Sequence, residues 1–368
     1  MIQPPPTYWD YLQLDALLSL QGGLERDESK LLPDELHFVL VHQTFELWFK
    51  LLLSELRLAR DHLAEPRVPE EHVPFVVHHL RRGGTILEHT IDAFRVMETL
   101  TPQDFLAFRD KLVPASGFQS FQMRELEILL GLEEAQRAAY AGSNPLDHIE
   151  KLAGDTPAGR LARERLQAVR GERTLRAALH DWLHRTPIHG SSPGDPGDEG
   201  VVERFLADYL ARLRAGHAEK LARLTAVLAT DPAALARQLE ASTDAARDFL
   251  EARDVDDAAR PRARRVRAGA LFIESYRELP LLAWPRLLLD TVVELEEQLV
   301  LWRTRHARMV ERVIGRRVGT GGSSGVDYLD QTARHRIFGE LWTVRAVLLA
   351  RDALPGPAAS DRYGFAPG

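Results

Sequence analysis

Apolar residues recur at intervals of three and four along most of this chain of 368 residues. This spacing places them on one face of an α-helix, whereas the alternation at every second residue that is typical of strands is almost absent. The clearest case is a long helix expected over residues 34–62. Its apolar face consists of Phe38, His42, Phe45, Phe49, Leu52 and Leu56. The pattern therefore predicts an all-α fold.

Another expected helix has a well-marked beginning. Thr101 is able to cap it, Pro102 suits its first turn, and Asp104 follows three positions after the cap. Phe105 and Arg109 then share one face, because residues four apart are neighbours on a helical surface. The sequence therefore predicts a helix that presents an aromatic ring and a guanidinium group on the same side.

Further helices are expected over residues 11–20, 74–100, 121–132, 160–185, 200–257 and 287–317. A segment rich in glycine and proline at 187–200 separates two of them, and we expect it to be a mobile loop. No internal repeat and no clear linker divide the chain. We therefore expect one helical domain over residues 1–368, in which residues 133–260 form a divergent helical insertion.

Composition and charge exclude several classes of protein. The net charge of -7 argues against a nucleic-acid binder that works through a broad basic surface. The arginine-rich run at 262–267 is best explained as a solvated helix face. The absence of cysteine excludes disulfides, thiolate nucleophiles, iron–sulfur clusters and thiolate-ligated haem, and it is compatible with a reducing cytoplasm.

The N-terminal residues lack the basic start and the apolar run of a signal peptide. No stretch approaches the roughly 20 apolar residues of a membrane span. We therefore expect a cytoplasmic protein without a membrane or nucleic-acid partner.

Two histidines stand out by position among the 14 in the chain. His306 lies in an apolar stripe of the helix expected over 287–317, and His42 has the same kind of position in its own helix. The other members of the stripe are Leu295, Leu299, Trp302, Met309 and Val313. A lone histidine on an apolar face is more often a hydrogen-bonded core residue than a ligand. Two of them in aromatic-rich helices also fit a shared haem or metal pocket.

Arg109 and a glycine-rich segment leave further alternatives open. A buried guanidinium needs an anion, which is either an internal carboxylate or the carboxylate of a ligand that it clamps with two hydrogen bonds. The segment 319–325 is either a flexible linker or a lid that orders over a ligand, with Thr320 forming a hydrogen bond.

Other polar residues are weaker candidates. His72, His78 and His79 with neighbouring glutamates could suggest a metal site, but a solvated helical face explains them better. Glu125 and Glu127 are two residues apart, so they point to different sides of a helix and cannot act as a pair.

Taken together, these blocks resemble the tryptophan 2,3-dioxygenase family. They match it in order and spacing over roughly residues 7–132 and 265–345. The matching blocks are 8–15 (YWDYLQLD), 34–50 (DELHFVLVHQTFELWFK), 105–109 (FLAFR), 114–120 (PASGFQS), 269–273 (GALFI), 302–306 (WRTRH), Gly315 and 319–325 (GTGGSSG). Several independent blocks make the resemblance specific.

The resemblance implies a role for each matching residue. His306 would be the proximal ligand of the iron of haem b, one haem per subunit and ferrous in the active state, and Ser116 would lie near a haem propionate. His42 would be the catalytic residue that contacts the indole nitrogen of L-tryptophan, either as a base or only to orient the substrate. The implied substrate contacts comprise Phe38, Val39, Leu40, Val41, His42, Phe105, Arg109 at the carboxylate, Thr320 near the ammonium group, and Tyr8 and Tyr11 from a neighbouring subunit of a homotetramer.

The implied reaction cleaves the indole C2–C3 bond of L-tryptophan with O2 and gives N-formylkynurenine, the first step of tryptophan degradation by the kynurenine pathway. Haem performs the oxidation, while the protein positions the indole and the amino-acid group. Two alternatives remain open. One is a related haem enzyme that oxidises a modified tryptophan or another indole, and the other is a non-catalytic sensor of haem or tryptophan.

Overall fold

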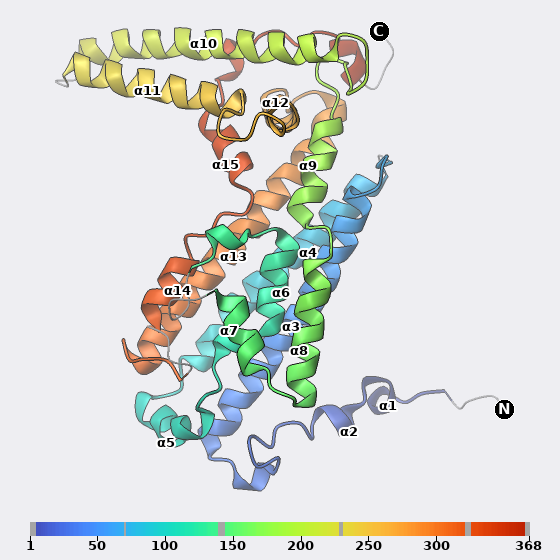
Figure 1. The fold of residues 1–368 in the computed structure, drawn as a ribbon, viewed down its shortest axis with the longest axis vertical. Coiled ribbons are helices and arrows are strands. Elements are labelled where there is room, and N and C mark those ends of the chain that lie inside the picture. The colour runs from blue at the N-terminus through green and yellow to red at the C-terminus, as the bar shows by residue number, and fades with distance from the viewer. Residues whose placement is uncertain (1–4, 70, 139–143, 228–230, 321–324, 365–368) are drawn as a thin grey trace. The chain divides into compact units, whose positions relative to one another are not determined.

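All regular elements in the described part of the chain are helices, as Figure 1 shows. The computed structural model describes residues 5–69, 71–138, 144–227, 231–320 and 325–364. Within these residues the extended pairing is confined to one isolated bridge between Ile188 and Ser191. The prediction of an all-α fold is confirmed.

The chain divides into two compact units. Unit 1 consists of Met1–Glu55, Arg82–Glu172 and Glu297–His335, and unit 2 consists of Leu56–Arg81, Arg173–Glu296 and Arg336–Gly368. Three long helices contribute residues to both: α3 (Pro33–Leu63), α4 (His72–Met97) and α13 (Ala283–Ile314). The expected single domain with an insertion over 133–260 stays a prediction.

The described residues of unit 1 also form seven shorter α-helices. They are α1 (Tyr8–Leu12), α2 (Leu14–Leu17), α5 (Pro102–Leu112), α6 (Phe121–Leu130), α7 (Pro145–Leu152), α8 (Pro157–Arg170) and α14 (Val326–Thr332). Helix α6 packs against α8 and is buried along most of its length, including its charged residues. The stripe expected on α13 lies inside the protein, since Leu299 and Val313 are only 2% and 5% exposed.

Local sequence accounts for the helix boundaries in unit 1. The predicted beginning of α5 is confirmed: the Asp104 amide donates to the Thr101 hydroxyl at 3.2 Å, and Pro102 occupies the first turn. The helix expected over 34–62 is α3. The helix expected over 11–20 is instead two short helices, because Gln13 between them has a left-handed backbone with φ of 49°.

Unit 2 is built from α9 (Leu175–Arg185), α10 (Asp198–Val227), α11 (Pro232–Leu250), α12 (Arg260–Ser275) and α15 (Gly339–Ala346), with parts of the three long helices. Helices α10 and α11 lie side by side as an antiparallel hairpin (Figure 1). Helix α12 packs against α9 and α15, and a Cβ added at Gly269 would lie 2.6 Å from the carbonyl oxygen of Leu183. Glycine at this position therefore allows α12 to approach α9 closely.

The arginine-rich run in α12 differs from its prediction. Arg265 and Arg267 are only 6% and 5% exposed, so the interpretation of the run as a solvated face is wrong for these two. Arg265 donates to Asp198 at 2.9 Å, and Arg267 binds both carboxylate oxygens of Asp254. Burial is tolerated because each guanidinium has a carboxylate partner.

The segment at 187–200 makes specific contacts. Ile188 is fully buried, and the amide of Gly190 donates to the hydroxyl of Tyr363 at 2.8 Å. Ser191 donates to Asp198 at the start of α10. The expected mobility of this segment stays a prediction.

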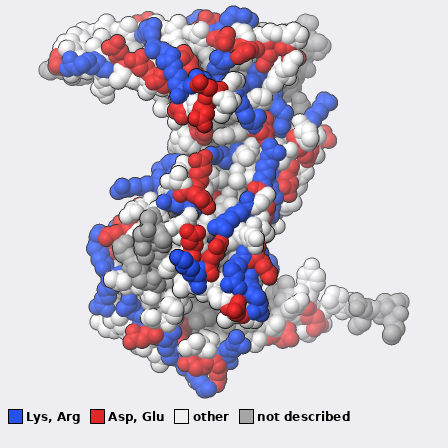
Figure 2. Space-filling model, viewed as in Figure 1, with Lys and Arg blue, Asp and Glu red and all other residues white. Residues whose placement is uncertain are grey.

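Acidic and basic side chains are interspersed on the face that Figure 2 shows. Ion pairs in the protein include Arg170 with Glu150 at 2.6 Å and Arg264 with Glu199 at 2.8 Å. Among the described helices, none has a stretch apolar and long enough for a membrane crossing.

Candidate active site

Unit 1 contains a cavity of about 530 Å³ that has a mostly apolar lining. Its volume falls in the range of small-molecule and cofactor sites. Helices α3, α4, α5, α6, α13 and α14 and the turn over 115–120 all contribute to its wall. The apolar lining includes Phe38, Val41, Phe45, Phe49, Phe94, Met97, Leu100, Phe105, Trp302, Met309 and Leu329. Elements far apart in the sequence therefore form one slot with aromatic walls.

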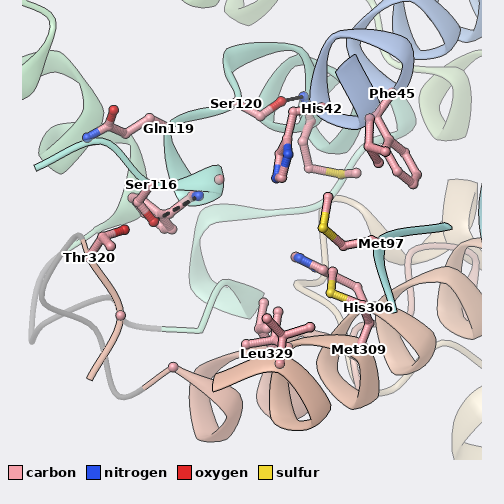
Figure 3. Close-up of a pocket in the computed structure, with 18 of the residues that line it drawn as sticks. His42, Phe45, Met97, Ser116, Gln119, Ser120, His306, Met309, Thr320 and Leu329 are labelled. Carbon is pink, nitrogen blue, oxygen red and sulfur yellow. Dashed lines mark hydrogen bonds between the residues drawn. The ribbon is translucent and has the colours of Figure 1, made fainter. Parts of the chain in front are cut away.

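Two histidines point into this cavity from different helices. His42 comes from α3 and His306 from α13, as Figure 3 shows. Burial lowers the pKa of both imidazoles. The pKa of His306 falls to about 4, because His42 and Arg124 also disfavour its charged form. Phe94 stacks on His306 with ring centroids 5.6 Å apart and an interplanar angle of 8°. Both imidazoles are therefore neutral at physiological pH, which is the state in which histidine binds a metal.

The ring of His42 is fixed in one tautomer by the backbone. Its Nδ1 lies 2.8 Å from the carbonyl oxygen of Phe38, and since a carbonyl only accepts, Nδ1 is the donor. The Nε2 atom of the neutral ring is then an acceptor. Phe38 stacks on His42 with centroids 4.0 Å apart and lies 5.9 Å from the ring of Phe105. His42 can therefore accept a hydrogen bond from a flat ligand held between aromatic rings.

Arg109 lies at another part of the wall. Its Nη2 donates to the carbonyl oxygen of Val318 at 2.6 Å, while its buried Nε has no partner among the described residues. No described carboxylate forms an ion pair with it, so the alternative of an internal salt bridge finds no partner in this part of the chain. The contact with Val318 holds one nitrogen of the guanidinium, and the other donors remain available to an anion in the cavity.

Thr320 and Ser116 line the cavity near one another (Figure 3). Thr320 donates its hydroxyl proton to the carbonyl oxygen of Ala115 at 2.6 Å, so its oxygen remains an acceptor. The Ser116 hydroxyl accepts from the amide of Phe118 at 3.3 Å and caps the short 3-10 helix Gly117–Gln119. Residues 321–324, the centre of the expected lid, lie outside the described residues.

Sequence reasoning missed a buried group of charges in the cavity wall. Three arginines surround the carboxylate of Glu127, which is 1% exposed: Arg124 at 3.0 Å, Arg137 at 2.7 Å and Arg303 at 3.0 Å. Burial opposes ionisation, but the guanidinium groups, Arg124 foremost, lower the pKa of Glu127. Arg124, Arg303 and Glu127 all line the cavity. The only sign of this group in the sequence is the presence of charged residues on otherwise apolar helices.

The two neighbouring glutamates act separately, as predicted from their spacing. Glu125 is fully buried and pairs with Arg165 of α8 at 2.7 Å, whereas Glu127 faces the cavity. One therefore ties α6 to α8, and the other belongs to the site.

Four residues implied as substrate contacts do not line this cavity. Val39 and Leu40 are turned away from it, because successive residues in a helix point about 100° apart, and Leu40 is 41% exposed. Tyr8 and Tyr11 on α1 are 71% and 77% exposed. Of the other implied residues, Phe38, Val41, His42, Phe105, Arg109, Ser116, His306 and Thr320 come together here.

The residues in the wall fit a haem. No hydrogen bond holds the His306 ring among the described residues, and the neutral imidazole points into the cavity beside Met97 and Met309 (Figure 3). Aromatic and thioether side chains suit the faces of a porphyrin, and excess arginine in the wall suits its carboxylates. His306 is therefore the residue that would bind the iron.

Comparison with known proteins agrees with this arrangement. The sequence profile of the family described as "Tryptophan 2,3-dioxygenase" matches residues 4–348, including the middle of the chain. A protein of Sorangium cellulosum called "Tryptophan 2,3-dioxygenase" is 48% identical over 97% of this chain and 87% of its own length. One of Ralstonia nicotianae called "Tryptophan 2,3-dioxygenase 2" is 46% identical over 98% of both chains. One of Xanthomonas campestris called "Tryptophan 2,3-dioxygenase-like protein" is 51% identical over 72% of this chain and 98% of its own length. The chain belongs to the tryptophan 2,3-dioxygenase family.

Proposed function

We propose that this protein is a haem-dependent dioxygenase that cleaves the indole C2–C3 bond of L-tryptophan with O2 to give N-formylkynurenine. One observation carries the proposal. A single cavity contains a neutral imidazole at His306, a hydrogen-bond acceptor at His42 and a guanidinium at Arg109, and no described residue forms a hydrogen bond with the first or an ion pair with the last. These groups suit an iron, an indole N–H and an amino-acid carboxylate respectively.

The protein's own residues position the substrate. Haem b, when bound with ferrous iron at His306, supplies the activation of molecular oxygen. The Nε2 atom of His42, which carries no proton in this tautomer, accepts a hydrogen bond from the indole N–H. His42 therefore orients the indole ring. Phe38 and Phe105 flank the indole, and Arg109 binds the carboxylate with two hydrogen bonds.

The polar end of the cavity completes the recognition of an amino acid. The Thr320 oxygen accepts a hydrogen bond from the substrate ammonium group while its hydroxyl donates to the carbonyl oxygen of Ala115. Ser116 would lie near a propionate of the bound haem. The apolar lining excludes water, which strengthens the hydrogen bonds at both ends of the substrate.

We further propose that the protein works in the cytoplasm as a homotetramer. The exposed side chains of Tyr8 and Tyr11 on α1 would then contact a neighbouring subunit's pocket. Large exposed aromatic side chains on a short helix are typical of surfaces that a partner covers.

The test is aerobic turnover of L-tryptophan by haem-loaded, reduced protein. N-formylkynurenine is followed by near-ultraviolet absorbance together with oxygen uptake. One oxygen molecule consumed per tryptophan supports the proposal. Haem binding without product overturns it, and ring-modified indoles would then distinguish the related enzyme from a sensor.

His306→Gly tests the proposed iron ligand separately. It should lose haem and product formation, and added imidazole should restore the haem absorbance. His89→Ala is a matched control, because His89 packs on Trp48 in the same unit and does not line the cavity. Retention of haem with an unchanged spectrum by His306→Gly would contradict the assignment.

A further inference from the structure

Unit 2 contains a second group of metal-binding side chain types. His62 lies in the last turn of α3, His72 is the first residue of α4, and Glu65 lies in the connection between them. None of the three lines the haem cavity described above. Within the described residues, this is the one set of three histidine or acidic side chains whose ligand atoms all come within 4.8 Å of one another.

The sequence suggested a different grouping of these histidines. The solvated face expected for His72, His78 and His79 is wrong for His79, which is 7% exposed and packs on Phe75 with ring centroids 4.1 Å apart. His72 instead faces His62, ten positions earlier in the chain. The helix pair, and not the local run, therefore brings the imidazoles together.

The three ligand atoms form a nearly equilateral triangle. The Nδ1 atoms of His62 and His72 are 3.2 Å apart, and Glu65 Oε1 lies 2.9 Å from the first and 3.2 Å from the second. Ligands at about 2.0–2.1 Å from a tetrahedral zinc ion are about 3.3 Å from one another. The three atoms therefore already lie close to one face of a zinc tetrahedron.

The chemistry and accessibility of the donors also fit such an ion. Two neutral imidazoles and one carboxylate are a set that zinc uses, with water in the fourth position. The side chains of His62, Glu65 and His72 are 28%, 34% and 32% exposed, so an ion and its water can reach them. The Nδ1 atoms of His62 and His72 face one another, so a divalent cation would bind both through their lone pairs.

The connection between the two helices is restrained without an ion. Pro66 and Pro69 fix their own φ angles, and the amide of His72 donates to the carbonyl oxygen of Pro69 at 2.9 Å. Less conformational entropy is then lost when a ligand ties Glu65 to the two helix ends. The ligands are therefore largely arranged before the ion binds.

We propose that His62, Glu65 and His72 form a zinc-type divalent metal site, separate from the haem pocket. The bound ion ties the end of α3 to the beginning of α4. The reaction of the haem pocket does not depend on it.

Titration of untagged, haem-loaded, EDTA-treated protein with Zn²⁺ tests this site. Isothermal calorimetry should show one zinc ion per chain, and elemental analysis after dialysis should show zinc in addition to iron. His72→Ala and Glu65→Gln should each weaken zinc binding by more than about tenfold, because loss of an outer-shell partner alone costs about 10–100-fold. Both variants should still form product from tryptophan.

His180→Ala is the matched control. His180 also pairs with a glutamate, Glu340 at 3.6 Å, and its side chain is 25% exposed, but it belongs to no such group of three among the residues that the structure describes. It should bind zinc as the unchanged protein does. Glu65→Gln keeps the size of the side chain, so it remains informative if His72→Ala does not fold. The proposal would be overturned if the unchanged protein had no stoichiometric zinc site. It would also be overturned if His72→Ala and Glu65→Gln bound zinc as tightly as the unchanged protein, or if His180→Ala lost as much zinc affinity as these two variants.

Discussion

Arg109→Lys tests whether the cavity recognises an amino-acid carboxylate. In the structure, Nη2 donates to Val318 and Nε is buried without a described partner, so the guanidinium is able to bind the backbone and a ligand at once. A lysine ammonium keeps the charge but lacks the planar fork that makes both contacts. The variant should lose about one charge-assisted hydrogen bond, worth about 1.5–3 kcal/mol.

This loss corresponds to a decrease of about 10- to 150-fold in kcat/KM for L-tryptophan. Most of it should appear in KM, because the carboxylate is bound alike in the ground state and the transition state. Arg109→Leu, which removes the charge as well, should lose more. Kinetics with saturating oxygen and haem-loaded protein measure both variants.

Tryptamine, which has the indole and the amine but no carboxylate, is the control ligand. Its dissociation constant, measured by titration of the haem spectrum, should be the same for the unchanged protein and for Arg109→Lys. If both ligands bind more weakly to the variant by the same factor, Arg109 acts by holding the segment at Val318 and not by binding the substrate. That result would refute the assignment.

Three further variants test the packing and charges around the site. Glu127→Gln should destabilise the protein by about 3–5 kcal/mol in urea denaturation, because three buried arginines lose their carboxylate. Glu125→Gln should cost less, because the Arg165 guanidinium that pairs with Glu125 is partly exposed. Gly269→Ala should destabilise by about 1–3 kcal/mol in thermal unfolding, and Gly216→Ala, which meets nothing within 4 Å, should not. Burial lowers the pKa of His335 in the folded protein to about 4. Between about pH 6.5 and pH 4 the unfolded chain therefore binds more protons at His335 than the folded protein does. The free energy of unfolding consequently falls as the pH drops through this range. His335→Gln should make that slope shallower, and an unchanged slope would contradict the argument.

The helices could be predicted from sequence where a local signal decides them. Thr101 and Pro102 marked the beginning of α5, and the apolar period of three and four defined α3. These signals depend only on neighbours in the chain, and tertiary contacts did not override them. The positions of His42 and His306 on apolar faces were also correct, but their joint use was implied only by the family resemblance.

The buried charges could not be predicted in the same way. Arg265 and Arg267 look like solvated residues in sequence, because arginine is usually exposed. Their burial depends on Asp198 and Asp254, which are 67 and 13 positions away. The sequence pattern of one helix contains no information about a partner in another segment of the chain. A solvated arginine is therefore distinguished from a paired one only in the folded structure.

The cavity wall contains buried charges of this kind. Arg124, Arg137 and Arg303 share the single carboxylate of Glu127, which leaves an excess of positive charge beside an apolar cavity. Burial of unbalanced charge is unfavourable, and removal of the carboxylate would make it more so. A porphyrin that carries propionates would supply the missing anions from inside the cavity. The wall is therefore better suited to an anionic cofactor than to a neutral apolar ligand of the same size.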